Sequence, residues 1–281
     1  MLNLGKLHFG GDYNPEQWPK DVWKQDIELM QKAGVNLVSL GIFSWAKIER
    51  SDGDYHFDWL DEAMELLHQG GIAVDMATAT ASPPAWLSKA NPEMRAVNFD
   101  GVQLSHGGRQ NYCAASSAYR EKASQLVEQI ASRYAKHPAV VMWHINNEYG
   151  CHTPYCYCEN SRKAFVAWLK ERYSSLEELN ASWGTDFWSQ RYYDWDELVV
   201  PKRTPDSTHP NPGQQIDFKR FTSELTLELY KMERDIIRKH DAVHPITTNF
   251  MSMKFTYAMD YWKWAKEMDF VSTDHYLAQH D

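Results

Sequence analysis

The sequence predicts an α/β protein with the (β/α)8 or TIM-barrel fold, truncated after about the sixth β/α unit. Short apolar runs alternate with segments whose apolar residues recur at helical spacing, which favours a parallel sheet covered by helices. The unusual residues follow strands, and these segments share one face of a barrel. Six units are present, whereas a closed barrel needs further strands to cover its first and sixth strands. We therefore expect residues 1–281 to form one partial barrel domain without strands 7 and 8 or any later domain.

Local signals justify each unit in order. Pro19 opens the first helix, Trp23, Ile27 and Met30 share its apolar face, and Gly34 ends it. A Gly-Gly pair ends the second helix and a His-Pro pair stops the third. The predicted strands cover residues 6–11, 35–40, 72–77, 140–145, 246–249 and 270–272. The helical stripes run through residues 23–30, 59–67, 119–134, 165–169, 218–236 and 257–264. No Gly-rich phosphate-binding motif opens a helix, so a nucleotide-binding open sheet has no motif in its favour.

Composition narrows the function classes. The formal net charge is −9 and acidic residues are spread along the chain, which disfavours nucleic acid or an anionic membrane as a partner. Aromatic residues make up 14% of the chain, an excess expected where sugar rings stack, although an aromatic core or subunit interface would also explain it. No apolar run approaches the ~18 residues of a membrane span, and the first residues lack a signal-peptide pattern. We therefore expect a cytoplasmic protein.

The end of the fourth predicted strand carries the clearest chemical signal. An apolar run over residues 140–145 stops at Asn146, Asn147 and Glu148. Such a run is typical of a parallel strand buried on both faces, and barrel enzymes keep their catalytic groups at the carboxyl ends of strands. A strand cap with a solvated Glu is the alternative for these residues taken alone.

Four sequence blocks together carry a family resemblance. They read GGDYNPEQW at residues 10–18, GIFSWA at 41–46, SPPAWL at 82–87 and NNEYG at 146–150. In this order and spacing they resemble the signatures of the glycoside hydrolase family 42 β-galactosidases, over essentially the whole chain. The resemblance implies a retaining, exo-acting enzyme that removes terminal β-linked galactose from galactosyl oligosaccharides, with no cofactor for catalysis. It also implies a homotrimer for the full-length protein.

The resemblance assigns roles to individual residues. Glu148 is expected to be the acid/base, which needs a raised pKa, and we expect Trp143 or Tyr149 to supply an apolar wall. Asn147 is expected to bind the sugar 2-hydroxyl. The nucleophile of this family is a Glu after the seventh strand, which this sequence does not reach, so the chain alone is expected to be inactive.

Two further residues match sugar-binding positions of the family. Arg109 matches a sugar-binding Arg after the third strand, and Trp188 resembles an aromatic that walls the galactose pocket. A surface Arg and a packing Trp are the alternatives. For the whole chain, the alternatives are another retaining barrel glycosidase, such as a cellulase or mannanase, and a non-catalytic fragment without the nucleophile.

The four cysteines form a separate group. Cys113 follows the third strand, and Cys151, Cys156 and Cys158 follow the fourth, so neighbouring loops can bring the thiols together. In a cytoplasmic protein such a cluster favours structural zinc over disulfides. The resemblance implies a Cys-x-Cys-x-x-Cys run in the second loop, but the last position here is Ser161. Cys151 replacing that ligand, a weak three-coordinate site, and inert thiols all stay open.

Overall fold

The computed structural model describes residues 7–205, 210–251 and 258–276. Its main sheet holds five parallel strands in the sequential order β1-β2-β3-β4-β5. They are β1 (Asp12–Tyr13), β2 (Leu37–Leu40), β3 (Ala73–Ala77), β4 (Val140–His144) and β5 (Ile246–Thr247). One residue after β5, β6 (Asn249–Phe250) pairs in parallel with β7 (Ser272–Thr273). Because Thr248 alone separates β5 from β6, the second ladder continues the first, and the order of strands is that of a barrel.

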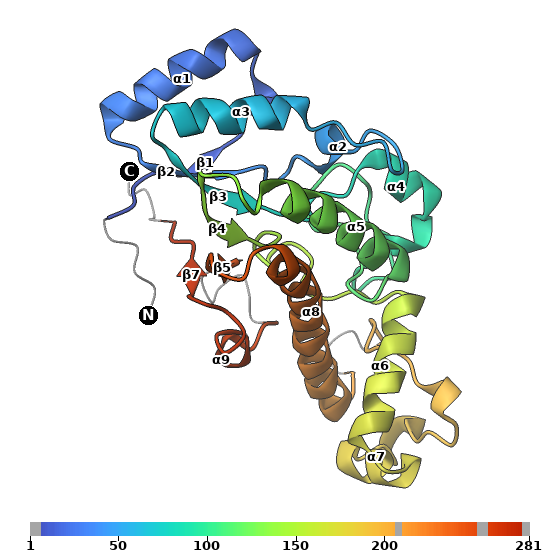
Figure 1. Cartoon of the computed structure of the whole chain (residues 1–281). Helices are drawn as coiled ribbons and strands as arrows, with labels where there is room; N and C mark the ends of the chain where they lie inside the picture. The colour runs from blue at the N-terminus through green and yellow to red at the C-terminus, as the bar shows by residue number, and fades with distance from the viewer. Residues whose placement is uncertain (1–6, 206–209, 252–257, 277–281) are drawn as a thin grey trace, which may run out of the picture.

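Helices follow one another around the strands (Figure 1). Those that connect consecutive strands are α1 (Lys20–Ala33), α3 (Asp58–Gln69), α5 (Ser117–Tyr134) and α8 (Pro212–His240). The other helices are α2 (Trp45–Ile48), α4 (Ala85–Ala90), α6 (Glu159–Arg172), α7 (Leu176–Trp183) and α9 (Tyr261–Trp264). Single 3-10 turns are η1 (Pro15–Gln17), η2 (Pro92–Met94), η3 (Phe187–Ser189) and η4 (Trp195–Glu197). Among the described residues, no helix combines the length and the apolar composition that crossing a membrane requires.

The predicted first strand is wrong in its position. We placed it at residues 6–11, but residues 7–11 form no strand, residue 6 lies outside the described part, and the strand is Asp12–Tyr13. The preceding residues still lie against β2, because Asn36 N donates to Phe9 O at 2.9 Å. A Cβ on Gly10 would lie 1.6 Å from Leu37 O, so this approach requires glycine.

Two apolar clusters stabilise the fold. The larger joins the strands to the inner faces of α1, α3, α5 and α8, and the predicted stripe residues Trp23 and Ile27 are buried in it. The smaller contains Phe165, Trp183 and Phe218 and joins α6 and α7 to the start of α8. In Figure 1, α6 and α7 lie apart from the sheet, and we call this part, residues 159–200, the lateral lobe.

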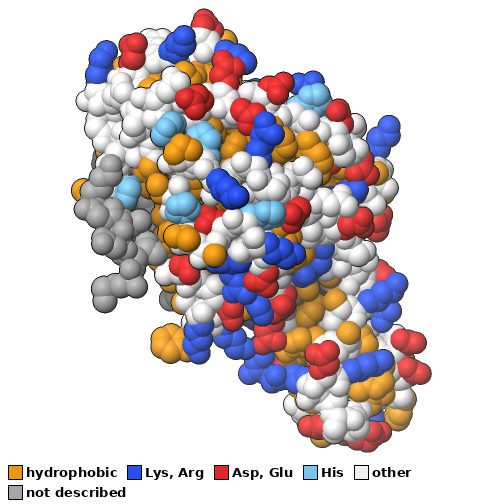
Figure 2. All heavy atoms as spheres, viewed as in Figure 1, with side chains coloured by type: hydrophobic (Ala, Val, Ile, Leu, Met, Phe, Trp, Pro, Cys, Tyr) orange, Lys and Arg blue, Asp and Glu red, His pale blue; other side chains and the backbone are white. Residues whose placement is uncertain are grey.

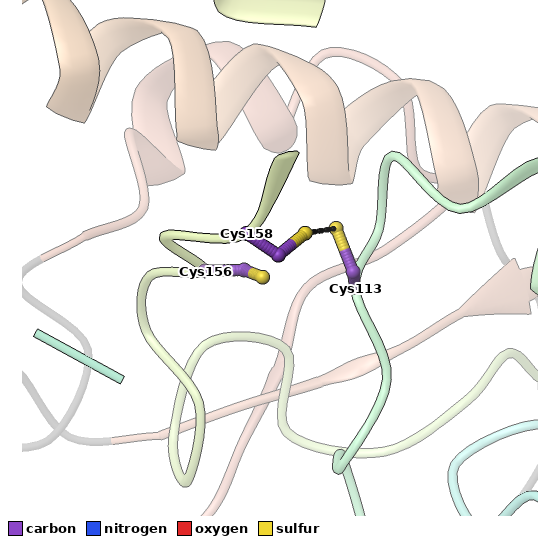
Figure 3. Close-up of side chains that lie close together, drawn as sticks. All are labelled: Cys113, Cys156 and Cys158. Carbon is purple, nitrogen blue, oxygen red and sulfur yellow. Dashed lines mark hydrogen bonds between the residues drawn. The ribbon is translucent and has the colours of Figure 1, made fainter. Parts of the chain in front are cut away.

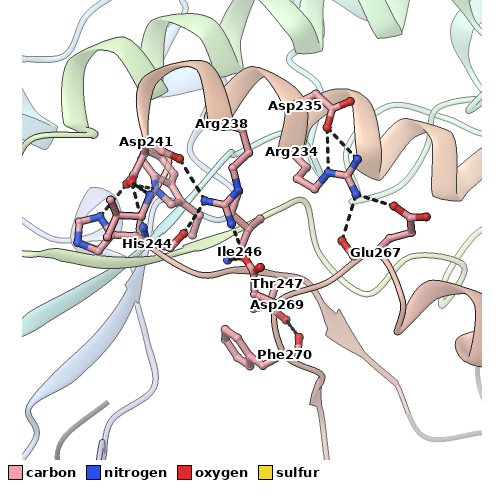
Figure 4. Close-up of polar contacts among 12 residues, drawn as sticks. Arg234, Asp235, Arg238, Asp241, His244, Ile246, Thr247, Glu267, Asp269 and Phe270 are labelled. Carbon is pink, nitrogen blue, oxygen red and sulfur yellow. Dashed lines mark hydrogen bonds and ion pairs between the residues drawn. The ribbon is translucent and has the colours of Figure 1, made fainter. Parts of the chain in front are cut away.

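The carboxyl-terminal half of α8 is tied to the strands beside it (Figure 4). Arg234 pairs with Glu267 at 2.7 Å, and Arg238 pairs with Asp269. Asp269 Oδ2 also accepts the backbone N–H of Ile246 at 2.7 Å. These contacts hold the beginnings of β5 and β7 side by side, so that the residues following both strands emerge next to each other.

Candidate active site

Glu148 lies at the end of β4 in an unusual backbone conformation. Its side chain is 3% exposed, and its φ is +47°, with Asn146 at +56°. Left-handed conformations cost non-glycine residues roughly 1–2 kcal/mol each and persist where surrounding contacts enforce them. Gln110 Nε2 lies 2.6 Å from both the Asn147 and the Glu148 carbonyl oxygens, and Asn249 Oδ1 accepts the Glu148 N–H at 2.9 Å. The turn that presents the carboxylate is therefore held from two sides.

Charged and polar groups surround the Glu148 carboxylate. Arg109 Nη1 lies 3.3 Å and His152 Nε2 3.5 Å from its Oε2. The Tyr276 hydroxyl donates to Oε1 at 3.4 Å. Asp274 lies on the same side, where burial and then the neighbouring Glu148 raise the pKa of its carboxyl to about 6. Two acidic groups and a guanidinium thus share this end of the sheet.

A buried polar network forms the floor beneath Glu148. His144 Nδ1 faces Asp75 Oδ2 at 3.4 Å, and its Nε2 faces Asn249 Oδ1 at 3.1 Å. Burial opposes protonation of His144, but the contacts with Asp75 and Asn249 outweigh it, so the pKa of the imidazole is raised. Asn249 Nδ2 donates to Asn147 Oδ1 at 3.1 Å and to Asp274 Oδ2 at 2.8 Å. Asn249 therefore links the acidic groups to the side chain and backbone of the turn.

The structure brings together three of the four residues predicted to act on sugar: Glu148, Asn147 and Arg109. Trp188 is not among them, and its predicted place in the pocket of this chain is corrected. It lies in η3 of the lateral lobe, 59% exposed, with its ring stacked on Phe187 at 4.8 Å. The lobe is inserted between β4 and α8 and projects away from the strand ends, which explains the separation (Figure 1).

The predicted apolar wall beside Glu148 is also corrected. Trp143 Nε1 donates to Asp241 at 2.8 Å, so this side chain faces the end of α8. The Tyr149 ring packs against Trp264 at 5.1 Å. Alternate residues of a strand point to opposite sides, and in β4 it is His144 rather than Trp143 that faces the polar floor.

Sequence reasoning missed three residues of the site: Asn249, Asp274 and Tyr276. Asn249 opens β6, Asp274 directly follows β7, and Tyr276 lies two residues further along. The rule that identified Glu148, a polar residue at the carboxyl end of a parallel strand, applies to them as well. An open hollow of about 360 Å³ adjoins Arg109 and is lined in part by Phe43, Pro83 and His106.

Three of the four thiols converge (Figure 3). The Sγ atoms of Cys113, Cys156 and Cys158 all lie within 4.8 Å of one another, and those of Cys113 and Cys158 are 3.5 Å apart. The predicted convergence of the fourth is wrong, because Cys151 groups instead with Glu148 and His152. Cys151 is only three residues from Glu148. It therefore lies in the tight turn after β4, beside Glu148, and not with the other three cysteines. Ser161, at the last position of the Cys-x-Cys-x-x-Cys run, has its Oγ 3.3 Å from Cys113 Sγ.

The cysteine cluster favours one thiolate. Cys158 caps the amino-terminal end of α6, and hydrogen bonds from the thiols of Cys113 and Cys156 hold its pKa well below the ordinary value. Backbone N–H groups at the start of α6 add to this effect. A tetrahedral zinc ion with Zn–S bonds of about 2.3 Å separates its sulfur ligands by ~3.8 Å. The spacing of the three sulfurs is compatible with such an ion, and the Ser161 hydroxyl lies beside one of them.

Comparison with known proteins assigns the chain to a family. The sequence model of the glycoside hydrolase family 42 β-galactosidases matches residues 12–281. The chain belongs to this family. Among curated family 42 relatives, the β-galactosidase LacZ of Heyndrickxia coagulans is 52% identical over 271 residues, 96% of this chain and 40% of the relative. The β-galactosidase of Geobacillus kaustophilus is 48% identical over 277 residues, 98% of this chain and 40% of the relative.

Solved family 42 structures confirm the predicted fold class. The β-galactosidase from Bacillus circulans sp. alkalophilus superposes with a TM-score of 0.91 at 43% identity, covering 98% of this chain and 41% of that one. A catalytic mutant of a family 42 β-galactosidase from G. stearothermophilus, with a glutamate replaced by alanine, gives 0.91 at 40% identity, covering 97% and 40%. The chain thus spans about 40% of the length of these relatives.

Proposed function

We propose that this chain supplies the acid/base half of a retaining, exo-acting β-galactosidase. The observation that carries the proposal is the Glu148 carboxylate, buried at the end of β4 and paired with Arg109, in a member of family 42. Retaining glycosidases use two carboxyl groups about 5–5.5 Å apart, one as acid/base and the other as nucleophile. We assign the first role to Glu148, and the second to a Glu beyond residue 281.

The proposed reaction has two displacements. Glu148 first protonates the glycosidic oxygen while the nucleophile attacks the anomeric carbon, which releases the aglycone and leaves galactose covalently bound. Glu148, now ionised, then removes a proton from water, which attacks the same carbon and frees galactose. Two inversions give net retention. Arg109 Nη1 lies 3.3 Å from Glu148 Oε2 and orients the carboxylate for both steps.

Asn147 is suited to the sugar 2-hydroxyl. Its Oδ1 is held by Asn249, whereas its Nδ2 is buried and has no hydrogen-bond partner among the described residues. A buried donor without a partner is costly, and a substrate oxygen would satisfy it. The contact would strengthen as positive charge develops on the sugar ring in the transition state.

The comparisons support a nucleophile outside this chain and galactose as the sugar. The glutamate replaced in the catalytic mutant from G. stearothermophilus lies, in the numbering of that protein, beyond the length of this chain. The relatives quoted above are named as β-galactosidases, which supports galactose over the glucose or mannose of related barrel enzymes.

Replacement of Glu148 by Gln in the enzyme with the complete barrel tests the assignment. We expect kcat/KM on lactose to fall by roughly 10²–10⁴-fold, because general acid catalysis contributes about that much. On a 2,4-dinitrophenyl galactoside, whose leaving group needs no proton, kcat/KM should fall less than about tenfold. Glu159→Gln, an exposed carboxylate on α6, is the control and should match wild type. Wild-type activity of Glu148→Gln on lactose would remove Glu148 from this role.

We further propose a structural zinc ion held by Cys113, Cys156 and Cys158, with the Ser161 hydroxyl or water completing the coordination. Such an ion would link the loop after β3 to the start of α6 and take no part in the reaction. We expect about one equivalent of zinc in the purified protein. In the Ser161→Cys variant, a chelator should take at least tenfold longer to remove the zinc than in the wild type. A zinc content of a tenth of an equivalent or less would exclude the site.

The homotrimer implied by the family also remains a proposal. Phe187 and Trp188 are 65% and 59% exposed and form an aromatic surface on the lateral lobe. In such an assembly Trp188 would line the pocket of a neighbouring subunit rather than its own. Light scattering of the complete enzyme should give the mass of three chains, and Trp188→Ala should raise KM for lactose. A monomeric mass together with an unchanged KM would rule out the trimer and this role of Trp188.

A further inference from the structure

Glu233, a fully buried carboxylate on α8, has no part in the proposed reaction. Its exposure is 0%, yet both of its oxygens lie 2.9 Å from Thr80 Oγ1, in the segment after β3. Burial raises the pKa of Glu233 to about 7, and hydrogen bonds with Thr78, Thr80 and Asn146 oppose the rise. Buried charges contribute little to stability compared with apolar residues of the same volume. The position of Glu233 is therefore better explained by what it orients.

Hydrogen-bond directions connect Glu233 to the turn after β4. In its ionised form Glu233 can only accept, and Thr80 then donates its single hydroxyl proton to Glu233. The Thr80 oxygen is then left to accept, and Asn146 Nδ2 donates to it at 3.0 Å. The chain of bonds thus runs from the Asn146 amide through Thr80 to Glu233 and has one direction.

The same chain fixes the other end of the Asn146 side chain. With Nδ2 committed to Thr80 and to the Tyr119 hydroxyl, Oδ1 accepts from the Tyr112 hydroxyl at 3.1 Å and from the Asn147 N–H at 2.8 Å. An inverted amide would place oxygen against Thr80 and NH₂ against the Asn147 N–H. The left-handed Asn146, at φ +56°, is therefore locked beside the two residues that act on substrate.

We propose that Glu233 is a positioning residue, which acts through Thr80 and Asn146 to hold the turn that presents Asn147 and Glu148. It touches no reacting atom, and its hydrogen bonds with Thr80, Thr78 and Asn146 all lead to the turn, with Thr80 the contact that can be removed most cleanly. The inference rests on the proposed function, because it assigns Glu233 a role in presenting the acid/base. Displacements of about 1 Å at a catalytic group can cost on the order of 10²-fold in rate.

A double-mutant cycle in the complete enzyme tests this role. Glu233→Met removes the acceptor and Thr80→Val removes the hydroxyl, both at nearly constant volume. We expect each to lower kcat/KM on lactose at least tenfold, and the double variant to lose no more than about threefold beyond the worse single variant, because both break one chain. Glu233→Gln, which keeps an acceptor for Thr80, should retain at least a third of the wild-type value.

The controls separate positioning from folding. Asp217→Asn alters another buried carboxylate of α8, which accepts from Tyr173 and Trp183 in the lateral lobe, and should leave kcat/KM unchanged. If Glu233→Met does not fold, Thr80→Val and Glu233→Gln still decide. Any of three results would overturn the role of Glu233. The first is a kcat/KM of Thr80→Val within twofold of wild type, and the second is a loss in the double variant equal to the product of the two single losses. The third is a kcat/KM of Glu233→Gln as low as that of Glu233→Met. Glu148→Gln is measured in parallel: its wild-type activity would defeat the proposed function, whereas its loss with an unaffected Thr80→Val defeats the positioning role alone.

Discussion

After β4, the two polar atoms of the Asn147 side chain differ in their surroundings. Asn249 holds Oδ1, and Nδ2 is buried without a hydrogen-bond partner among the described residues. In the proposed reaction this donor is already oriented before substrate binds, which is how a neutral residue favours the transition state.

A substrate lacking one hydroxyl tests this contact. We predict that Asn147→Ala lowers kcat/KM on a nitrophenyl β-galactoside about 100-fold, because 2-hydroxyl contacts supply several kcal/mol at the transition state. On the 2-deoxy analogue, the variant and wild type should agree within about threefold. Equal losses on both substrates would show that Asn147 acts on something other than the 2-hydroxyl.

Asp241 joins two elements, the end of α8 and the start of β5. It accepts from Trp143 Nε1 at 2.8 Å and from the backbone N–H groups of Val243 and His244, both at 3.0 Å (Figure 4). These donors outweigh the burial that opposes them and lower the pKa of Asp241 to about 2. The carboxylate therefore stabilises the junction that aligns β5 beside β4.

The stability that Asp241 contributes should depend on pH. Its folded pKa lies below the ordinary 3.8, so the contribution is present above pH 3.8 and is lost as pH falls toward 2. We predict that Asp241→Asn lowers the free energy of unfolding by about 2 kcal/mol at pH 7 and that the difference narrows between pH 4 and pH 2. Urea unfolding across this range measures it, and a difference that stays constant would contradict the assignment.

The packing of the first strand against the second depends on Gly10. A Cβ at this position would meet Leu37 O, whereas one on Gly11 would meet nothing within 4 Å. We predict that Gly10→Ala lowers the free energy of unfolding by more than about 2 kcal/mol, in the range of overpacked sites. The adjacent control, Gly11→Ala, should change it by less than about 0.5 kcal/mol. Similar effects of the two substitutions would show that β1 lies differently.

Across the whole molecule, sequence patterns predicted the helices and strands better than they predicted which residues lie next to one another in space. Glu148 was predictable because an apolar strand and a polar end are both local signals. The family resemblance, rather than a local pattern, assigned Arg109 to the same site, and its side chain lies 3.3 Å from Glu148 Oε2. Trp188 was misplaced because nothing local says that residues 159–200 leave the barrel as a separate lobe.

Contacts between distant segments explain the remaining misses. Asn249 follows Glu148 by 101 residues. Its hydrogen bonds with the Glu148 N–H and with Asn147 Oδ1 form only when β4 and β5 lie side by side. Cys151 has the same chemistry as Cys156 and Cys158, and its separation from them depends on the turn at Glu148. On the face in Figure 2, acidic and basic side chains intermingle.

The proposed division of the catalytic pair between this chain and later residues predicts a large difference in activity. A polypeptide ending at residue 281 should hydrolyse lactose at least about 10³-fold more slowly than one carrying all eight barrel strands, because a retaining enzyme needs its nucleophile. Circular dichroism of both proteins would show whether each is folded. Comparable activity would mean that the nucleophile lies within residues 1–281.

Chemical rescue of Glu148→Ala tests the central claim most directly. In the enzyme with the complete barrel, a 2,4-dinitrophenyl β-galactoside should still form the covalent intermediate, and azide, which needs no general base, should then attack it. We predict that azide raises kcat at least tenfold and that the product is β-galactosyl azide. An absence of rescue, or a product of α configuration, would contradict the assignment of Glu148 as acid/base.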